Sequence, residues 1–266
     1  MPQLLENIIN NHLCYEVLDK LLENSGAWDK VMCIENINKP IITEKTGCFF
    51  GVPNNHGSLP YFRCPSFFES IVAPDWLQEK ILKELNKYFD KNFNSIKVQK
   101  YINGKSGIGR HSDKAVDMHN DCPIVIYRVN KECDKTRSLC FRNKTTNEEI
   151  KIDMPSNSLL IITPDENKKF VHYVPNEEDN ATDECISFVF RKIDTFIDPF
   201  TKFKYGIGAK YKTYEERFSA KDQEPIDMRD DKIKIDIVRM YNFENTHDLT
   251  QDDPVEFYQN VINKTV

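Results

Sequence analysis

Six short runs of β-branched and aromatic residues, all between residues 96 and 193, constrain the fold of this chain more than any other feature. Asn, Asp, Lys and Gly separate the runs, and the sequence between them predicts no helix. So many short strands in under a hundred residues indicate a double-sheet jelly roll or a barrel. The six runs are IKVQKYI, CPIVIYRV, RSLCFR, EEIKID, SLLIITP and ECISFVFRKI.

Two segments before this region have helical periodicity. Residues 3–24 place leucine, isoleucine and valine at helical spacing, so we expect a helix there. A second helix should begin at Pro74 and Asp75 and continue to Phe89. The predicted fold class is therefore α+β: a double-stranded β-helix (jelly roll) core with supporting N-terminal helices and a C-terminal extension.

The segment SGIGRHSDK carries the first candidate for chemistry, because His111 and Asp113 lie two residues apart. On a strand, residues at that spacing point to the same face. The spacing alone is weak, since the segment HND repeats it eight residues later. A further histidine, His172, lies in the later strand-like run KKFVHYVP. His-x-Asp on one strand and a histidine on a facing strand form the 2-His-1-carboxylate site of non-haem Fe(II) oxygenases, although a lone buried histidine is more often a core residue.

The segment FNSIKVQKYINGKSGIGRHSDKAVDMHNDCPIVIYRV, residues 93–129, resembles the AlkB family of Fe(II)/2-oxoglutarate dioxygenases, which repair or demethylate alkylated nucleic acids. It contains a strand leading to a tyrosine, a Gly-x-x-x-His-x-Asp turn and a Pro-Ile-Val strand. Downstream, SLLIITP with VHYVP is similar to the strand-turn-His-x-x-Pro of the family, and CISFVFR is similar to its terminal motif. The resemblance covers roughly residues 10–193. We therefore expect an AlkB-like dioxygenase domain over residues 1–198, and the different composition after it predicts that residues 199–266 are an extension of unknown role packed on or beside the core.

Carried over residue by residue, the resemblance implies that His111, Asp113 and His172 hold Fe(II), and that the HND segment, His119 to Asp121, lies in a loop. Besides Fe(II), such enzymes use 2-oxoglutarate as cosubstrate and O₂. The cosubstrate would become succinate and CO₂ while a substrate C–H bond is hydroxylated. On an N-methyl base, the product would release formaldehyde and leave the demethylated base.

The resemblance also implies a cosubstrate site, with three departures. Tyr101 would donate its hydroxyl to 2-oxoglutarate, and Arg191 would pair with the carboxylate beside the metal. Gln99 replaces the family asparagine, as a longer amide that can still reach. Cys185 stands where the family has the arginine for the distal carboxylate, and a thiol cannot replace a guanidinium. Ala115 stands where an acidic residue often reads the base.

Arg128 is a candidate for the lost arginine. It shares strand parity with Ile126, a position that faces the cosubstrate in the family, so its side chain would point inward. An inward basic residue on that strand anchors the distal carboxylate in some other 2-oxoglutarate oxygenases. The alternative is an outward arginine paired with a surface acid.

The formal net charge of −6 excludes a generally cationic nucleic-acid binder but leaves room for a local basic groove, so DNA or RNA is a candidate partner beside 2-oxoglutarate. Clustered lysines more often form a solvent-exposed face than a binding site. The cations near the predicted site are Lys97, Lys100, Lys105, Arg110 and Lys114, and those in the tail are Lys202, Lys204, Lys210 and Lys212, with Tyr205 and Tyr211 among them.

Eight cysteines without a CxxC pair, a start unlike a signal peptide and no stretch of membrane-spanning length indicate an intracellular protein, cytoplasmic or nuclear, without a membrane partner.

Three functions stay open at this point. The first is oxidative demethylation of an N-alkylated nucleobase in DNA or RNA, against which Ala115 and the acidic net charge argue mildly. The second is hydroxylation of a protein or a small molecule by the same chemistry. The third is a non-catalytic nucleic-acid- or protein-binding jelly roll that has lost 2-oxoglutarate binding, which Cys185 favours.

Overall fold

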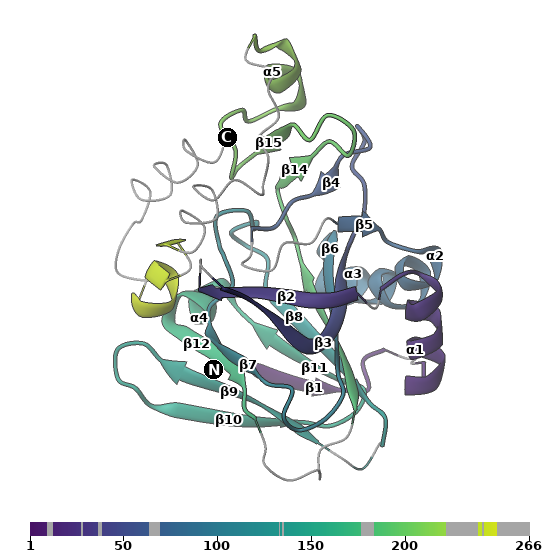
Figure 1. The fold of residues 1–266 in the computed structure, drawn as a ribbon, viewed down its shortest axis with the longest axis vertical. Coiled ribbons are helices and arrows are strands. Elements are labelled where there is room, and N and C mark those ends of the chain that lie inside the picture. The colour runs from purple at the N-terminus through teal and green to yellow at the C-terminus, as the bar shows by residue number, and fades with distance from the viewer. Residues whose placement is uncertain are drawn as a thin grey trace.

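The larger of two facing layers is an eight-stranded sheet in the computed structural model, which describes residues 1–9, 13–27, 29–36, 39–63, 70–132, 134, 136–176, 184–221, 239–240 and 242–248 (Figure 1). Its order is β1-β11-β8-β13-β6-β3-β2, and β5 pairs in parallel with β3. The strands are β1 (Gln3–Glu6), β2 (Asp29–Asn36), β3 (Lys39–Gly51), β5 (Ser70–Val72), β6 (Ser95–Tyr101), β8 (Ile124–Asn130), β11 (Ser158–Ile162) and β13 (Cys185–Arg191).

The smaller layer is a four-stranded sheet in the order β10-β9-β12-β7. Its edge strand β10 alternates exposed charged residues with half-buried Ile150 and Ile152, as expected for a sheet with one wet face. A cluster that includes Tyr101, Leu139 and Phe141 fills the space between the layers, so the two sheets form a jelly roll. The strands are β7 (Ile108–His111), β9 (Arg137–Asn143), β10 (Glu149–Met154) and β12 (Phe170–Val174). All six predicted strands are present.

Helices cover the other face of the larger sheet, on the side away from the smaller sheet (Figure 1). The predicted helix from residue 75 to residue 89 is confirmed as one continuous run with a π-helical turn in its middle. Its apolar residues, with Leu18 and Leu22 of α1, pack against β6, β8 and β13. The elements are α1 (Tyr15–Asn24), α2 (Asp75–Leu77), η1 (Gln78–Leu82) and α3 (Lys83–Phe89).

The predicted helix over residues 3–24 is wrong in its first part, because residues 3–6 form β1, an edge strand paired with β11. Leu4 packs on the cluster between the sheets, whereas Leu5 packs on the cluster under the helices. Consecutive residues on opposite faces require the two-residue period of a strand. Pairing with β11 also satisfies backbone groups of this segment.

A short helix, α4 (Pro164–Lys169), lies between two strands where the sequence predicts none. Thr163 caps it: the Thr163 hydroxyl accepts a bond from the Glu166 amide, and the Glu166 carboxylate accepts one from the Thr163 amide. Pro164 suits the first helical turn, where its missing N–H leaves no bond unmade. The Thr-Pro-Asp-Glu sequence carries this signal.

A third, three-stranded sheet joins the chain on either side of residue 198, with the order β15-β14-β4. It lies at the upper end of the molecule in Figure 1, next to α5. Its pairing spans the predicted boundary between residues 198 and 199, and the division into two domains stays a prediction. Among the helices that the structure describes, none is long and apolar enough to cross a bilayer. The elements are β4 (Leu59–Pro60), β14 (Thr195–Ile197), β15 (Lys204–Gly206) and α5 (Tyr214–Ser219).

A buried ion pair ties this end of the molecule to the core. Asp117 is fully buried and Arg63 is 2 % exposed. The Asp117 carboxylate accepts bonds from the Arg63 amide and guanidinium, and Arg63 Nη2 also donates to the Gly208 carbonyl at 2.6 Å. The pair therefore links three chain segments.

We expect Asp117→Ala to lower the free energy of unfolding by about 3–5 kcal/mol, because the buried Arg63 charge would lose its carboxylate partner. Urea denaturation measures this. In the control variant Lys83→Ala, which removes the exposed Lys83–Glu79 pair, the unfolding midpoint should stay the same. An Asp117→Ala variant as stable as the wild type would contradict the assignment.

Candidate metal centre and pocket

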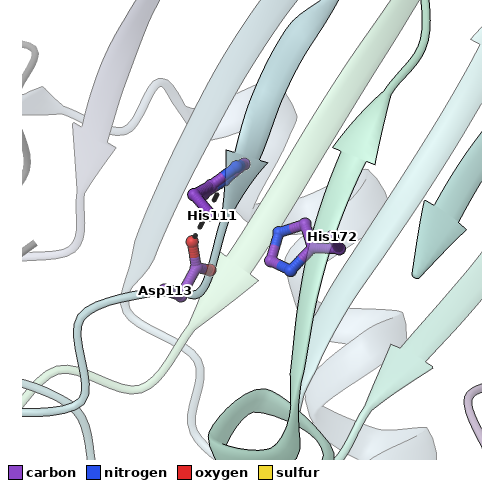
Figure 2. Close-up of side chains that lie close together, drawn as sticks. All are labelled: His111, Asp113 and His172. Atoms are coloured by element: carbon purple, nitrogen blue, oxygen red, sulfur yellow. Dashed lines mark ion pairs between the residues drawn. The ribbon is translucent and has the colours of Figure 1, made fainter. Parts of the chain in front are cut away.

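Two histidines and an aspartate meet between the sheets (Figure 2). His111 ends β7 and stands directly opposite His172 of β12, with ring centroids 4.3 Å apart. Asp113 follows in the loop after β7, and its Oδ1 lies 3.8 Å from His111 Nε2. One donor atom from each of the three residues lies within 4.8 Å of the other two. The structure thus brings together the three residues that the spacing and the resemblance pointed to.

The competing HND segment lies apart from this cluster, in a loop as expected. His119 is exposed over 46 % of its side chain, and its Nδ1 is 2.5 Å from the Asp194 carboxylate. Among the described residues, His119 is not part of a group of donors that could hold a metal ion, whereas His111, Asp113 and His172 are.

The protonation of the cluster suits a cation. Burial lowers the pKa of His111 well below its usual value, and it lowers the pKa of His172 to about 4. Burial alone would raise the pKa of the Asp113 carboxyl, but Arg191 and the two histidines outweigh it and hold that pKa well below its usual range. Two neutral imidazoles and one ionised carboxylate are the protonation states that metal binding requires.

The orientation of the donors fits as well. His111 Nδ1 lies 2.8 Å from the Gly109 carbonyl, so Nδ1 is the protonated nitrogen of the ring. Nε2 is then unprotonated, and its lone pair can bind a metal. Both bonds from Arg191 go to Asp113 Oδ2, from Nε at 2.8 Å and from Nη2 at 2.5 Å, so Oδ1 stays on the side of the histidines. Two imidazoles and a carboxylate are a donor set that non-haem Fe(II) sites use, so the residues fit this metal.

Arg191 has a different partner here from the one that the resemblance implies. Its guanidinium pairs with Asp113 and lies 4.5 Å from the centre of the Phe62 ring. Its third nitrogen, Nη1, is buried and has no hydrogen-bond partner among the described residues. That nitrogen is the donor left for a cosubstrate carboxylate, and the pairing with 2-oxoglutarate stays a prediction.

The two histidines of the metal cluster and the predicted cosubstrate residues line one pocket between the two sheets. The larger sheet contributes residues from its three central strands, and the smaller sheet contributes the histidines and an apolar wall. The lining residues are Lys97, Gln99, Tyr101, Ile126, Arg128, Ser187, Val189 and Arg191 on the first side, and Ile108, His111, Leu139, His172, Tyr173 and Val174 on the second.

Strand register explains why Arg128 points into this pocket. Arg128 of β8 stands opposite Ser187 of β13, which stands opposite Gln99 of β6, so the three share one face. Ile126 lies two residues away on the same face, as the parity argument expects, and both line the pocket. Cys185 and Tyr101 form the next row.

Arg128 is buried without a counter-charge. It is 1 % exposed, and Nη1 donates to the Arg137 carbonyl at 2.5 Å. Its Nε is buried and has no hydrogen-bond partner in the part of the chain that the structure describes, and no described carboxylate forms an ion pair with it. The alternative of an outward arginine with a surface acid is therefore wrong. A buried cation with a free donor beside a pocket favours an incoming anion.

Two residues that support the site were not anticipated. The Asn167 side chain of α4 accepts a bond from the Asp113 amide and donates to the Asp113 carbonyl, both at 2.8 Å. Arg137 is buried and donates to the carbonyls of Asn103, Gly104 and Ser106, which shapes the loop before β7. The capping-box sequence of α4 was the available signal for Asn167, while nothing local marks Arg137.

The predicted basic groove near the site does not form as a set of free cations. Lys114 is buried in an ion pair with Glu244, Lys100 pairs with Asp19, and Arg110 pairs with Glu149. In the tail, Lys204 is also buried. Lys97 differs, because it lies in the pocket itself, over the Phe49 ring at 5.8 Å.

No protein-family model and no curated protein matches this sequence. Among solved structures, OsALKBH1 is similar with a TM-score of 0.45 and 12% identity, over 72% of this chain and 97% of that chain. A prolyl hydroxylase in complex with a hypoxia inducible factor oxygen degradation domain peptide fragment, from Trichoplax adhaerens, has a TM-score of 0.43 and 16% identity, over 72% of this chain and 83% of that chain. What the site can do therefore has to follow from its own residues.

Proposed function

We propose that this protein is an Fe(II)- and 2-oxoglutarate-dependent dioxygenase that hydroxylates a C–H bond. The observation that supports this most is that His111 and His172 of a 2-His-1-carboxylate donor set line the same pocket as Arg128, a buried arginine whose Nε has no hydrogen-bond partner among the described residues. His111, Asp113 and His172 would hold Fe(II) from one side and leave its other positions open. When bound, the metal would supply the activation of O₂.

The chain's own residues would bind and orient the cosubstrate. Arg128 would bind the distal carboxylate of 2-oxoglutarate through its Nε, which has no hydrogen-bond partner among the described residues. It would take over the role of the family arginine, whose position is occupied here by Cys185. Gln99 and Tyr101 lie in the same row and the next row of the larger sheet and would add side-chain bonds. Arg191 would use Nη1 for the carboxylate beside the metal while it keeps Asp113 ionised.

Apolar side chains would keep water away from the reacting atoms. Ile126 and Val189 of the larger sheet face Leu139 and Val174 of the smaller sheet around the pocket. Apolar surroundings have a low dielectric constant, so charge-assisted hydrogen bonds to a dicarboxylate are stronger there than in water.

For the substrate, we propose an N-alkylated nucleobase in DNA or RNA as the first class to test. Phe49 and Phe62, whose ring centroids are 6.3 Å apart, lie beside the pocket residues Lys97 and Arg191. Flat rings next to cations suit a base and its phosphate. Hydroxylation of an N-methyl group would leave a hydroxymethyl group, which would depart as formaldehyde and return a proton to the nitrogen.

An anaerobic titration of the protein with Fe(II) and 2-oxoglutarate tests the class. We expect the visible charge-transfer absorption of an iron-bound 2-oxo acid to develop and saturate. Protein that holds iron but shows no such band at millimolar 2-oxoglutarate would overturn the proposal in favour of a binding module.

Turnover then tests the substrate. With N-methylated oligonucleotides we expect succinate and formaldehyde to be released in equal amounts. Succinate formed only with peptides or small molecules, with a product 16 mass units heavier, would instead point to the alternative hydroxylase; that mass is the one oxygen atom added by hydroxylation.

A further inference from the structure

The C-terminal segment of residues 239–240 and 242–248 bonds to the loop that carries Asp113 and lies beside α4 and β12 (Figure 1). Its described residues 239–240 and 242–246 are helical. Met240 is fully buried and Glu244 is 1 % exposed, so the segment is packed against the core. Its polar partners include Ser112, Lys114 and Ala115, in the loop that carries Asp113.

Three side chains accept the main-chain amides of the loop that carries Asp113. The Ser112 amide donates to Asn245 Oδ1 at 2.8 Å, and the Ala115 amide donates to Glu244 Oε1 at 3.3 Å. Between them, the Asp113 amide donates to Asn167. Since β7 ends at His111, these amides lie beyond its strand pairing, and the three side chains satisfy them instead.

A buried charge pair reinforces the arrangement. Lys114 Nζ lies 2.7 Å from Glu244 Oε2, and the two side chains are 2 % and 1 % exposed. Lys114 Nζ also lies 3.3 Å from the Ser112 carbonyl. A buried ammonium requires its carboxylate partner, so the loop and the C-terminal segment are held to each other.

We propose that the C-terminal segment is a positioning element of the metal centre, in which Glu244 and Asn245 fix the loop 112–115 so that Asp113 meets the two histidines. The inference rests on the proposed metal site but not on the cosubstrate or the substrate. Partners of this kind set the orientation of a ligand, and their loss typically weakens metal binding by about 10–100-fold. It assigns a role to part of the extension after residue 198.

The test is Co(II) binding to the full-length protein, followed by its visible absorption and by calorimetry, since Co(II) does not need O₂ or cosubstrate. Asn245→Leu keeps the size of the side chain and removes the acceptor for the Ser112 amide. We expect it to bind Co(II) at least about 10-fold more weakly than the wild type. Asn245→Asp keeps an acceptor oxygen and should retain wild-type affinity. Asn242→Ala, an exposed asparagine on the same segment, is the matched control and should have no effect.

The outcomes separate this inference from the proposed function. A wild-type protein that does not bind Co(II) would reject the metal site itself. A wild type that binds, with Asn245→Leu and Glu244→Gln binding equally well, would reject the positioning role alone. Thermal unfolding of the metal-free variants shows whether each one folds. If Glu244→Gln does not fold, the result with Asn245→Leu decides the test. Equal weakening in Asn245→Leu and Asn245→Asp would also overturn the inference, because the acceptor oxygen would then not matter.

Discussion

Replacing His172 by alanine is expected to abolish metal binding and, with it, turnover of 2-oxoglutarate. The variant loses one of three donors that lie within 4.8 Å of one another. We expect affinity for Fe(II) or Co(II) to fall by more than about 100-fold, which exceeds the effect of losing an outer partner of a ligand. Anaerobic calorimetry measures the affinity, and succinate formation measures the turnover.

His119→Ala is the matched control for this experiment. It also removes one imidazole, but His119 is exposed and pairs with Asp194 outside the cluster. Metal affinity and turnover should stay at the wild-type level. Equal losses in both variants, or full binding in His172→Ala, would show that the three residues do not form the metal site.

Replacing Arg128 by methionine should remove 2-oxoglutarate binding while leaving the metal in place. Methionine keeps much of the buried aliphatic part of the arginine side chain and removes the guanidinium. Loss of one partner of a buried, hydrogen-bonded charge pair costs about 2–5 kcal/mol, so we expect the Kd of 2-oxoglutarate to rise by about 30-fold or more. The anaerobic absorption titration measures this directly, with Co(II) or Fe(II) affinity as the second readout.

A shorter 2-oxo acid makes the assignment of Arg128 specific. 2-Oxobutanoate has the metal-binding end of 2-oxoglutarate but no distal carboxylate. The wild type should prefer 2-oxoglutarate strongly, and Arg128→Met should bind both acids with similar, weak affinity. Arg142→Met, a change of the same kind at an arginine that bonds to Asn147 away from the pocket, should keep the wild-type preference. A preference that survives in Arg128→Met would assign the distal carboxylate to another residue.

Local periodicity was enough to predict much of this fold. The six strands between residues 96 and 193 follow from short runs of β-branched and aromatic residues and from the turn residues between them. The helix that begins at Asp75 follows from its start signal and its apolar face. The inward direction of Arg128 also follows, because strand parity is a local property.

Local periodicity was not enough where partners lie far apart in the chain. The leucines of β1 are compatible with a helix, and only pairing with β11 made them a strand. Lys114 looked like a surface cation, and the burial of Glu244 beside it decided otherwise.

By itself, the sequence determined the six strands predicted between residues 96 and 193, the main helix and the candidate donors His111, Asp113 and His172, because each depends on the pattern of a few residues. The tertiary structure alone decided what surrounds the donors. Asn167 is 54 residues from Asp113, Glu244 is 129 residues from Ala115, and Asn245 is 133 residues from Ser112. Contacts at such separations form only when the whole chain packs, and no periodicity in a short segment encodes them.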